Sequence, residues 1–211
     1  MITFITVKGK SIRCARKNHK LLPILLNKVK EFLDIIVITD SKEISNICEK
    51  HNINYYIEDK ELIDEFHSIY NYLNDTNRLE EITEFALLPV THPLCNIETI
   101  MKVVYSDISQ YDVVTTFTYI NDRSIFYLNE ENEFIISNTE RKGSLCSKVK
   151  MADGSCYKLT THFLKQVINS NNSNYTFWNY GKIKFIENSS EYYIDIDEKI
   201  DLMIFEKYFK K

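Results

Sequence analysis

Residues 3–39 read TFITVKGKSIRCARKNHKLLPILLNKVKEFLDIIVIT and predict one strand–helix–strand unit. Thr3–Val7 and Ile35–Thr39 are short runs rich in β-branched residues, which favour buried strands. Between them, Leu21–Leu33 carries apolar side chains at three- and four-residue spacing, which indicates a helix. Two strands joined by a helix of this length predict a parallel pair with a right-handed crossover.

The same alternation continues to the end of the chain. Further strands are predicted at Ile53–Tyr56, Thr83–Val90, Asp112–Phe117 and Tyr192–Ile196, and further helices after the caps Asp40 and Asn96, at Glu61–Tyr72 and at Lys199–Tyr208. Residues 122–180 are less regular and predict an insertion that forms a lid or dimerisation part. We expect a single α/β domain over residues 1–211 with a mostly parallel sheet.

Composition excludes several classes of protein. The chain has 211 residues, 44% hydrophobic and 27% charged, which is ordinary for a globular domain. Its net charge of −4 argues against a general nucleic-acid binder. No apolar run is long enough to span a bilayer and the first residues lack a signal-peptide pattern, so we expect a cytoplasmic protein without a membrane partner. The five cysteines form no CxxC pair, which favours reduced thiols over a disulfide framework or a zinc site.

A basic loop follows the first predicted strand. Lys8–Lys20, KGKSIRCARKNHK, holds six Lys or Arg residues and no acid. Ligands of open α/β sheets bind beyond the carboxyl ends of the strands, where backbone N–H groups and a helix N-terminus attract anions. Gly9 and Ser11 permit close backbone approach, while Arg13 and Lys17 supply fixed charge that pairs well with phosphate. The loop therefore predicts a phosphate site, although it is not a Walker A loop, and a solvated basic loop is the alternative.

Four short motifs stand in order along the chain. They are Ser11–Asn18 (SIRCARKN), Ile36–Asp40 (IVITD), Leu88–Leu94 (LPVTHPL), and Ile194–Asp197 (IDID) followed by Asp201-Leu202. In order and spacing they resemble the S-x-R-x-P-x-K-N loop, the S-T-D strand end, the L-Q-P-T-S-P-L segment and the closing I-D-I-D-x-x-x-D-L segment of the acylneuraminate cytidylyltransferase family, the CMP-sialic acid synthetase-like enzymes.

The resemblance implies both a fold and an activity. The fold would be a Rossmann-like nucleotidyltransferase three-layer sandwich, usually a homodimer. The activity would be transfer of CMP from CTP to an acidic sugar, such as a sialic-acid-like nonulosonate for surface polysaccharide, with release of pyrophosphate and with Mg²⁺ as cofactor.

The resemblance also implies roles for particular residues. The nucleotide-binding set would be Lys8, Gly9, Lys10, Ser11, Arg13, Lys17, Asn18 and Thr91. Arg13, Lys17 and Asp197 would act in catalysis, and Asp195 and Asp197 would hold the metal. Two carboxylates spaced by two residues point to one face of a strand, and Mg²⁺ takes one or two carboxylates together with substrate oxygens.

The chain departs from the family pattern at several positions. Lys10 replaces a glycine, Ala15 replaces a proline, His92 stands where Ser is common, and Glu58-Asp59 takes the place of an Arg-Pro pair. These departures leave two alternatives: a different acceptor, such as a phosphonate, or a member that binds nucleotide without turnover. A glycosyltransferase with Asp195 and Asp197 in a D-x-D metal motif is disfavoured, because the basic loop and the acidic pair lie at opposite ends of the chain.

Overall fold

The computed structural model describes residues 1–59, 64–121, 127–128, 134–135, 148–170, 181–189 and 193–208. Within them, a seven-stranded sheet has the order β3-β2-β1-β4-β8-β5-β9. Its strands are β1 (Ile2–Val7), β2 (Asp34–Thr39), β3 (Asn54–Ile57), β4 (Glu84–Leu87), β5 (Val113–Asn121), β8 (Lys148–Thr160) and β9 (Ile183–Glu187). Only β8 is antiparallel to its neighbours in this sheet; the pairs β3-β2, β2-β1, β1-β4 and β5-β9 are parallel. The predicted mostly parallel α/β sheet is confirmed.

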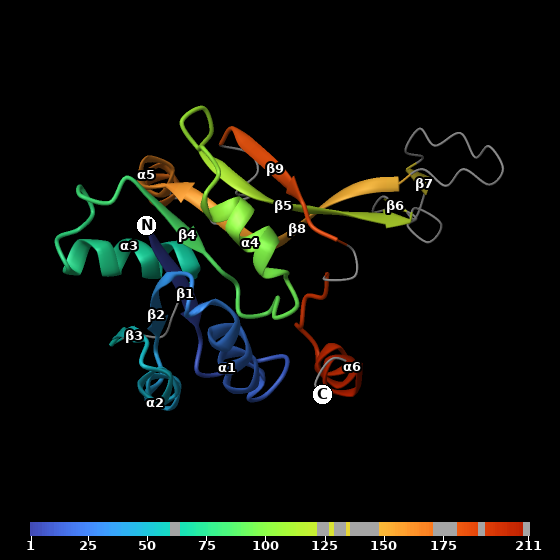
Figure 1. Cartoon of the computed structure of the whole chain (residues 1–211), viewed down its shortest axis with the longest axis horizontal. Helices are drawn as coiled ribbons and strands as arrows, with labels where there is room; N and C mark the ends of the chain where they lie inside the picture. The colour runs from blue at the N-terminus through green and yellow to red at the C-terminus, as the bar shows by residue number, and fades with distance from the viewer. Residues whose placement is uncertain are drawn as a thin grey trace.

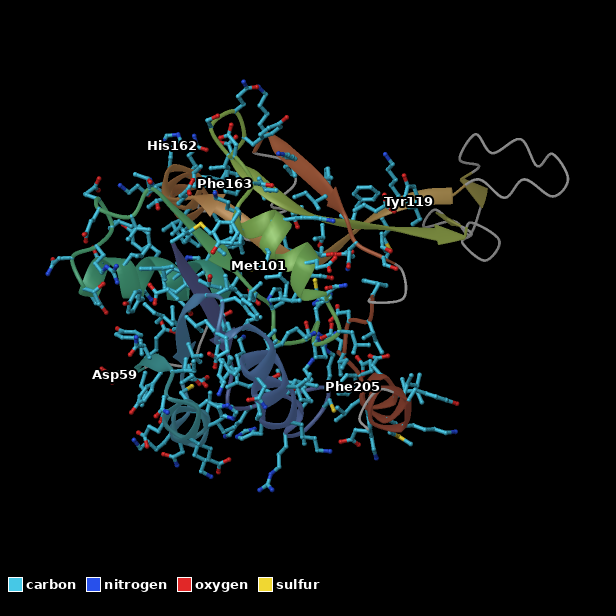
Figure 2. All side chains as sticks on the ribbon, in the orientation of Figure 1. Asp59, Met101, Tyr119, His162, Phe163 and Phe205 are labelled. Atoms are coloured by element: carbon cyan, nitrogen blue, oxygen red, sulfur yellow. The ribbon has the colours of Figure 1, made fainter. Side chains whose placement is uncertain are left out.

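Helices cover both faces of this sheet and make it the middle of three layers (Figure 1). The helices are α1 (Lys17–Val29), α2 (Lys42–His51), α3 (Glu65–Asp75), α4 (Ile97–Val104), α5 (Thr161–Asn169) and α6 (Lys199–Tyr208). Side chains of α1, α2, α4 and α6 share one core, and those of α3 and α5 share the other. Phe205 and Phe163 represent the two cores in Figure 2. Because both faces are covered, Phe4, Ile5 and Val7 of β1 are all buried.

Helix α1 begins at Lys17, before the predicted start at Leu21. The apolar periodicity marks only the residues that pack on the core, whereas Lys17 and Asn18 are buried through polar contacts. Arg16 precedes the helix in the left-handed region, with φ of 60°.

The predicted cap of helix α2 is wrong by one residue. Ser41, not Asp40, caps the helix, and its hydroxyl accepts a hydrogen bond from the N–H of Ile44. The Asp40 carboxylate accepts instead from the N–H of Gly9, at 2.6 Å. The cap predicted at Asn96 is confirmed for α4.

The segment predicted as an irregular insertion contributes to the main sheet. Lys148–Thr160 forms the long strand β8 between β4 and β5, and Thr161–Asn169 forms α5. Buried polar residues such as Asp153 and Lys158 interrupt the apolar pattern of β8, so the sequence did not indicate a strand here. β5 and β8 extend together beyond the helices, with the small hairpin β6 (Tyr127–Leu128) and β7 (Phe134–Ile135) beside their ends (Figure 1). Tyr175–Tyr180, an aromatic run of the same segment, lies outside the described residues.

The strand predicted at Tyr192–Ile196 is not formed in its described part, residues 193–196. This segment leaves the sheet and crosses the turn after β4, where the N–H of Ile196 donates to the carbonyl of Thr91 at 2.9 Å. Ile196 is fully buried between the half-buried Asp195 and Asp197. The predicted helix at Lys199–Tyr208 follows and is confirmed as α6. None of the helices in the described ranges is both long and apolar enough to cross a bilayer.

Candidate functional site

A pocket of about 400 Å³ opens at the carboxyl end of β1. Its lining comes from three places: Lys8, Lys10, Ser11, Arg13, Lys17 and Asn18 around the start of α1; Asp64 and Glu65 at the start of α3; and Pro89, Val90 and Thr91 after β4. Helix α1 packs on one face of the sheet and α3 on the other. The pocket therefore lies at the switch point between β1 and β4, where open α/β sheets bind ligands.

Lys17 is the buried cation of this pocket, with 6% of its side chain exposed. Its Nζ donates to the backbone carbonyl of Ile196 at 2.7 Å and to Oδ1 of Asp197 at 2.8 Å. These contacts satisfy an ammonium group that could not be buried alone. They also attach the start of α1 to the segment before α6.

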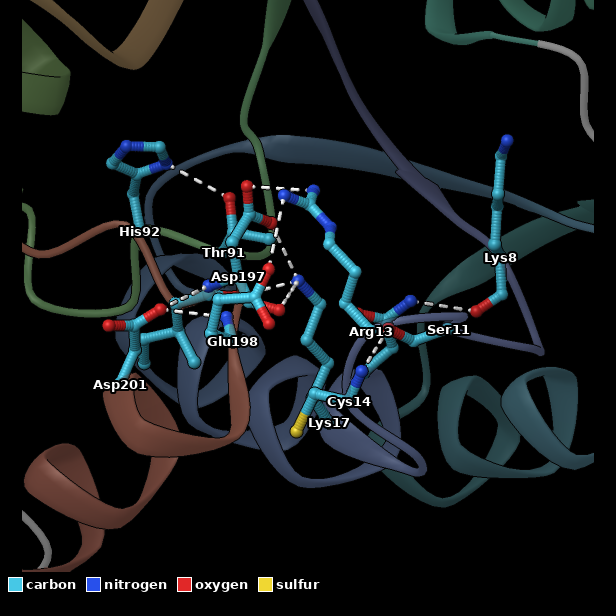
Figure 3. Close-up of polar contacts among 12 residues, drawn as sticks. Lys8, Ser11, Arg13, Cys14, Lys17, Thr91, His92, Asp197, Glu198 and Asp201 are labelled. Atoms are coloured by element: carbon cyan, nitrogen blue, oxygen red, sulfur yellow. Dashed lines mark hydrogen bonds and ion pairs between the residues drawn. The ribbon is translucent and has the colours of Figure 1, made fainter.

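Arg13 approaches the same carboxylate from the solvent side. Its guanidinium lies 2.8 Å from Oδ2 of Asp197, so one carboxylate receives two cations (Figure 3). Partial burial raises the pKa of Asp197, but the hydrogen bond and charge of Lys17 and the charge of Arg13 outweigh it and hold the pKa below its ordinary value. Two predicted phosphate-binding cations and one predicted metal ligand thus meet in one cluster.

Asn18 and Ser11 shape the loop from within. The Asn18 amide donates to the carbonyl of Lys8 at 2.8 Å, which ties the end of β1 to α1. Its Oδ1 is buried and has no hydrogen-bond partner among the described residues. The hydroxyl of Ser11 accepts from the N–H of Cys14 at 3.3 Å. Asn18 therefore keeps an acceptor atom available beside the pocket.

Gly9 lies outside this pocket, against the β2–α2 junction. A Cβ added at Gly9 would lie 2.4 Å from Cβ of Ser41, so only glycine allows this approach. Its N–H is engaged by Asp40. A neighbouring hollow of about 520 Å³ has Gly9, Lys10, Asp40, Glu58 and Asp59 among its lining residues.

Thr91 lines the pocket, while the adjacent His92 is buried behind it. The Thr91 hydroxyl lies 3.1 Å from Nδ1 of His92, whose ring points away from Arg13 and Lys17 (Figure 3). Burial lowers the pKa of His92 and is opposed by the charge of Asp195. Burial thus favours the neutral form of His92, whose Nδ1 contacts the hydroxyl of Thr91.

The donor set of the acidic segment fits Mg²⁺, a hard ion that takes carboxylate oxygens. Oδ1 of Asp195 is buried without a hydrogen-bond partner among the described residues, whereas both oxygens of Asp197 are occupied by Lys17 and Arg13. The described part of the chain gathers no group of three or more potential metal-binding side chains, so a metal here would need further oxygens from a ligand. The metal roles of Asp195 and Asp197 remain predictions.

Sequence reasoning missed the acidic side of the pocket. Asp64 and Glu65 line it from the start of α3, across from the basic loop. Their signal was positional: they follow the carboxyl end of the third strand, where the chain turns into a helix on the opposite face. The buried network of Asp153, Thr116 and Asn188 on β8, β5 and the residue after β9 was missed as well.

Comparisons with known proteins find solved structures of similar fold. No protein-family model matches the chain, and no curated protein matches its sequence. Among solved structures, a 4-diphosphocytidyl-2C-methyl-D-erythritol synthase from Anaerococcus prevotii is similar over 100% of this chain and 98% of that chain, with a TM-score of 0.71 and 15% identity. A CMP:2-keto-3-deoxy-manno-octonic acid synthetase complexed with CTP is similar over 98% of both chains, with a TM-score of 0.68 and 11% identity.

A third similar structure is HddC from Yersinia pseudotuberculosis, which matches over 96% of both chains with a TM-score of 0.56 and 13% identity. At these identities the likeness concerns the fold. The chain has the α/β fold seen in these three structures, and this agrees with the three-layer α/β architecture expected from the resemblance.

Proposed function

We propose that this protein is a CTP-dependent cytidylyltransferase that transfers CMP to an acidic sugar and releases pyrophosphate. The observation that carries the proposal is the cluster of Lys17, Arg13 and Asp197 at the switch-point pocket. A buried lysine and an exposed arginine that converge at a helix N-terminus suit a triphosphate better than an uncharged ligand. Two of the similar folds are named for cytidyl transfer, one of them with CTP bound.

The phosphates would take the position beside the two cations. Arg13 is 57% exposed and can turn from Asp197 toward a phosphate, whereas Lys17 is held in place by Ile196. Lys8 and Lys10 add charge at the rim of the same pocket. Burial of Lys17 strengthens its interaction with a ligand, because the local dielectric is low.

The reaction would proceed by attack of an acceptor oxygen at the α-phosphorus. The new acceptor-oxygen–phosphorus bond forms as the bond to the β-phosphate oxygen breaks, so pyrophosphate leaves and the acceptor loses its proton. Negative charge grows on the α-phosphate and the leaving group, and Arg13 and Lys17 are positioned to stabilise it. Mg²⁺, if held by Asp195 and Asp197, would neutralise further charge on the phosphate oxygens.

Pyrophosphate release tests the proposal. The full chain is incubated with CTP, Mg²⁺ and a panel of acidic sugars, and melting shifts are recorded with all four nucleoside triphosphates. A CTP-selective melting shift together with turnover on one sugar acid is the expected result. Absence of a shift with every triphosphate would contradict the proposal and leave the loop as a solvated basic segment.

For the identity of the acceptor, one observation favours an alternative to a sugar acid. Glu58 and Asp59 put acidic side chains beside the neighbouring hollow, where the family pattern has a cation. This favours, as a second candidate, an acceptor other than a sugar acid, such as a phosphonate, or nucleotide binding without turnover. Turnover with a phosphonate identifies the former, and a CTP shift without turnover on any acceptor identifies the latter.

A further inference from the structure

The switch-point pocket is lined by cationic side chains from one side and by acidic side chains from the other. Arg13 and Lys17 line it from the face of the sheet that carries α1. Asp64 and Glu65 line it from the start of α3, which packs on the opposite face. A nucleoside triphosphate has the same polarity, with anionic phosphates at one end and an uncharged base that carries hydrogen-bond donors at the other.

The two acids on the α3 side are not equivalent. Asp64 is the N-cap of α3: its Oδ1 accepts from the N–H of His67 at 2.9 Å, and its Oδ2 lies 2.7 Å from Nδ1 of the same residue. Glu65 is exposed and makes no hydrogen bond or ion pair with any residue in the described ranges. Its charge helps to raise the pKa of Tyr157 on β8, after burial and the charge of Asp153. Glu65 is therefore the pocket's available hydrogen-bond acceptor on this side.

We infer that Glu65 is a specificity-determining residue, and that its carboxylate accepts a hydrogen bond from the exocyclic amino group of cytosine. The inference rests on the proposed function and deepens it. Carboxylates accept from the N4 amino group of cytosine, and they are repelled by the O4 carbonyl of uracil at the same position. A site built to pair with an N–H rejects the analogue that lacks it when the bound base shields the acceptor from water, because the acceptor is then left without a partner.

The substitution Glu65→Gln separates this role from a general effect of charge. A glutamine amide keeps an oxygen that accepts from cytosine and adds an N–H₂ group that donates to uracil. We therefore expect the ratio of CTP to UTP affinity to fall by about ten-fold or more, chiefly because UTP binds better. Glu98→Gln is the matched control, since Glu98 is an exposed first-turn glutamate of α4 outside the pocket.

Titration calorimetry of the full-length chain with Mg²⁺ and CTP or UTP gives the two affinities for the wild type and both variants. A lowered ratio in Glu65→Gln with an unchanged ratio in Glu98→Gln is the expected result. CTP binding by the wild type with the same ratio in Glu65→Gln would overturn the role of Glu65 alone. Failure of the wild type to bind either triphosphate would overturn the proposed function and this role with it.

Discussion

Lys17 and Asp197 form an ion pair at 2.8 Å although 180 residues separate them in sequence. The pair joins the first helix to the segment before the last one, and Arg13 completes it from the outside. Asp197 is the shared carboxylate partner of the two cations that we assign to the phosphates. Under the proposed function, phosphate oxygens would take the place of the Asp197 carboxylate as partners of these cations, so Lys17 would always have a counter-charge.

Replacing Asp197 tests the acidic side of this exchange. Asp197→Ala should reduce metal-dependent pyrophosphate release by about 100-fold or more, because charge stabilisation in the site is lost. The variant should still fold but melt at a lower temperature, because Lys17 keeps its hydrogen bond to the carbonyl of Ile196 and loses its buried counter-charge. Steady-state kinetics with varied Mg²⁺ and a circular-dichroism melt provide the two readouts. Wild-type kinetics in a folded variant would show that the assignment of Asp197 is wrong.

Replacing Arg13 tests the cationic side. Arg13→Ala should lower both CTP affinity and turnover, each by roughly ten-fold, because a charge-assisted contact to phosphate is removed. Stability should change by less than about 1 kcal/mol, as is usual for exposed ion pairs. Lys20→Ala is the control: Lys20 pairs with Glu206 at 2.6 Å on the surface and does not line the pocket. Equal effects of the two substitutions would indicate a diffuse field of charge instead of a defined contact.

Gly9 allows the basic loop to approach the β2–α2 junction. Gly9→Ala should destabilise the protein by about 1–3 kcal/mol, because the new Cβ would overlap Cβ of Ser41, only 2.4 Å away. Combining it with Ser41→Gly removes the overlapping atom. In a double-mutant cycle measured by urea denaturation, the two costs should therefore be less than additive. Strict additivity would show that the close approach carries no energetic coupling.

The hydrogen bond of Tyr56 should make the stability of the protein depend on pH in the alkaline range. The Tyr56 hydroxyl donates to Asp75 at 2.5 Å, and this hydrogen bond, with lesser contributions from burial and nearby carboxylates, raises the pKa of Tyr56 to about 12. A raised pKa means that the folded state holds the proton more tightly. The stabilisation is therefore complete below the unfolded pKa of about 10 and is lost as pH rises toward the folded value. Tyr56→Phe should weaken this loss between pH 9 and pH 11, and urea midpoints at the two pH values measure it.

Local sequence was sufficient to predict much of the fold. Runs of β-branched residues predicted β1 and β2, and apolar residues at helical spacing predicted α1, α4 and α6. Both patterns depend only on residues that are close together in the sequence. The basic loop was also recognisable, because its charge and its position after a strand are both local features. The boundaries were less accurate: α1 begins at polar residues, whose burial depends on partners far along the chain.

Tertiary structure alone decided how these parts combine. The sequence indicated the paired acids Asp195 and Asp197 as strand residues, but the segment leaves the sheet because it bonds to the turn at Thr91. The order of strands brought the starts of α1 and α3 to one pocket, and so placed Glu65 and Arg13 in the lining of the same site. Residue spacing determines which side of a helix or strand is apolar. Which elements share a site depends on chain topology and long-range packing, and no local pattern encodes them.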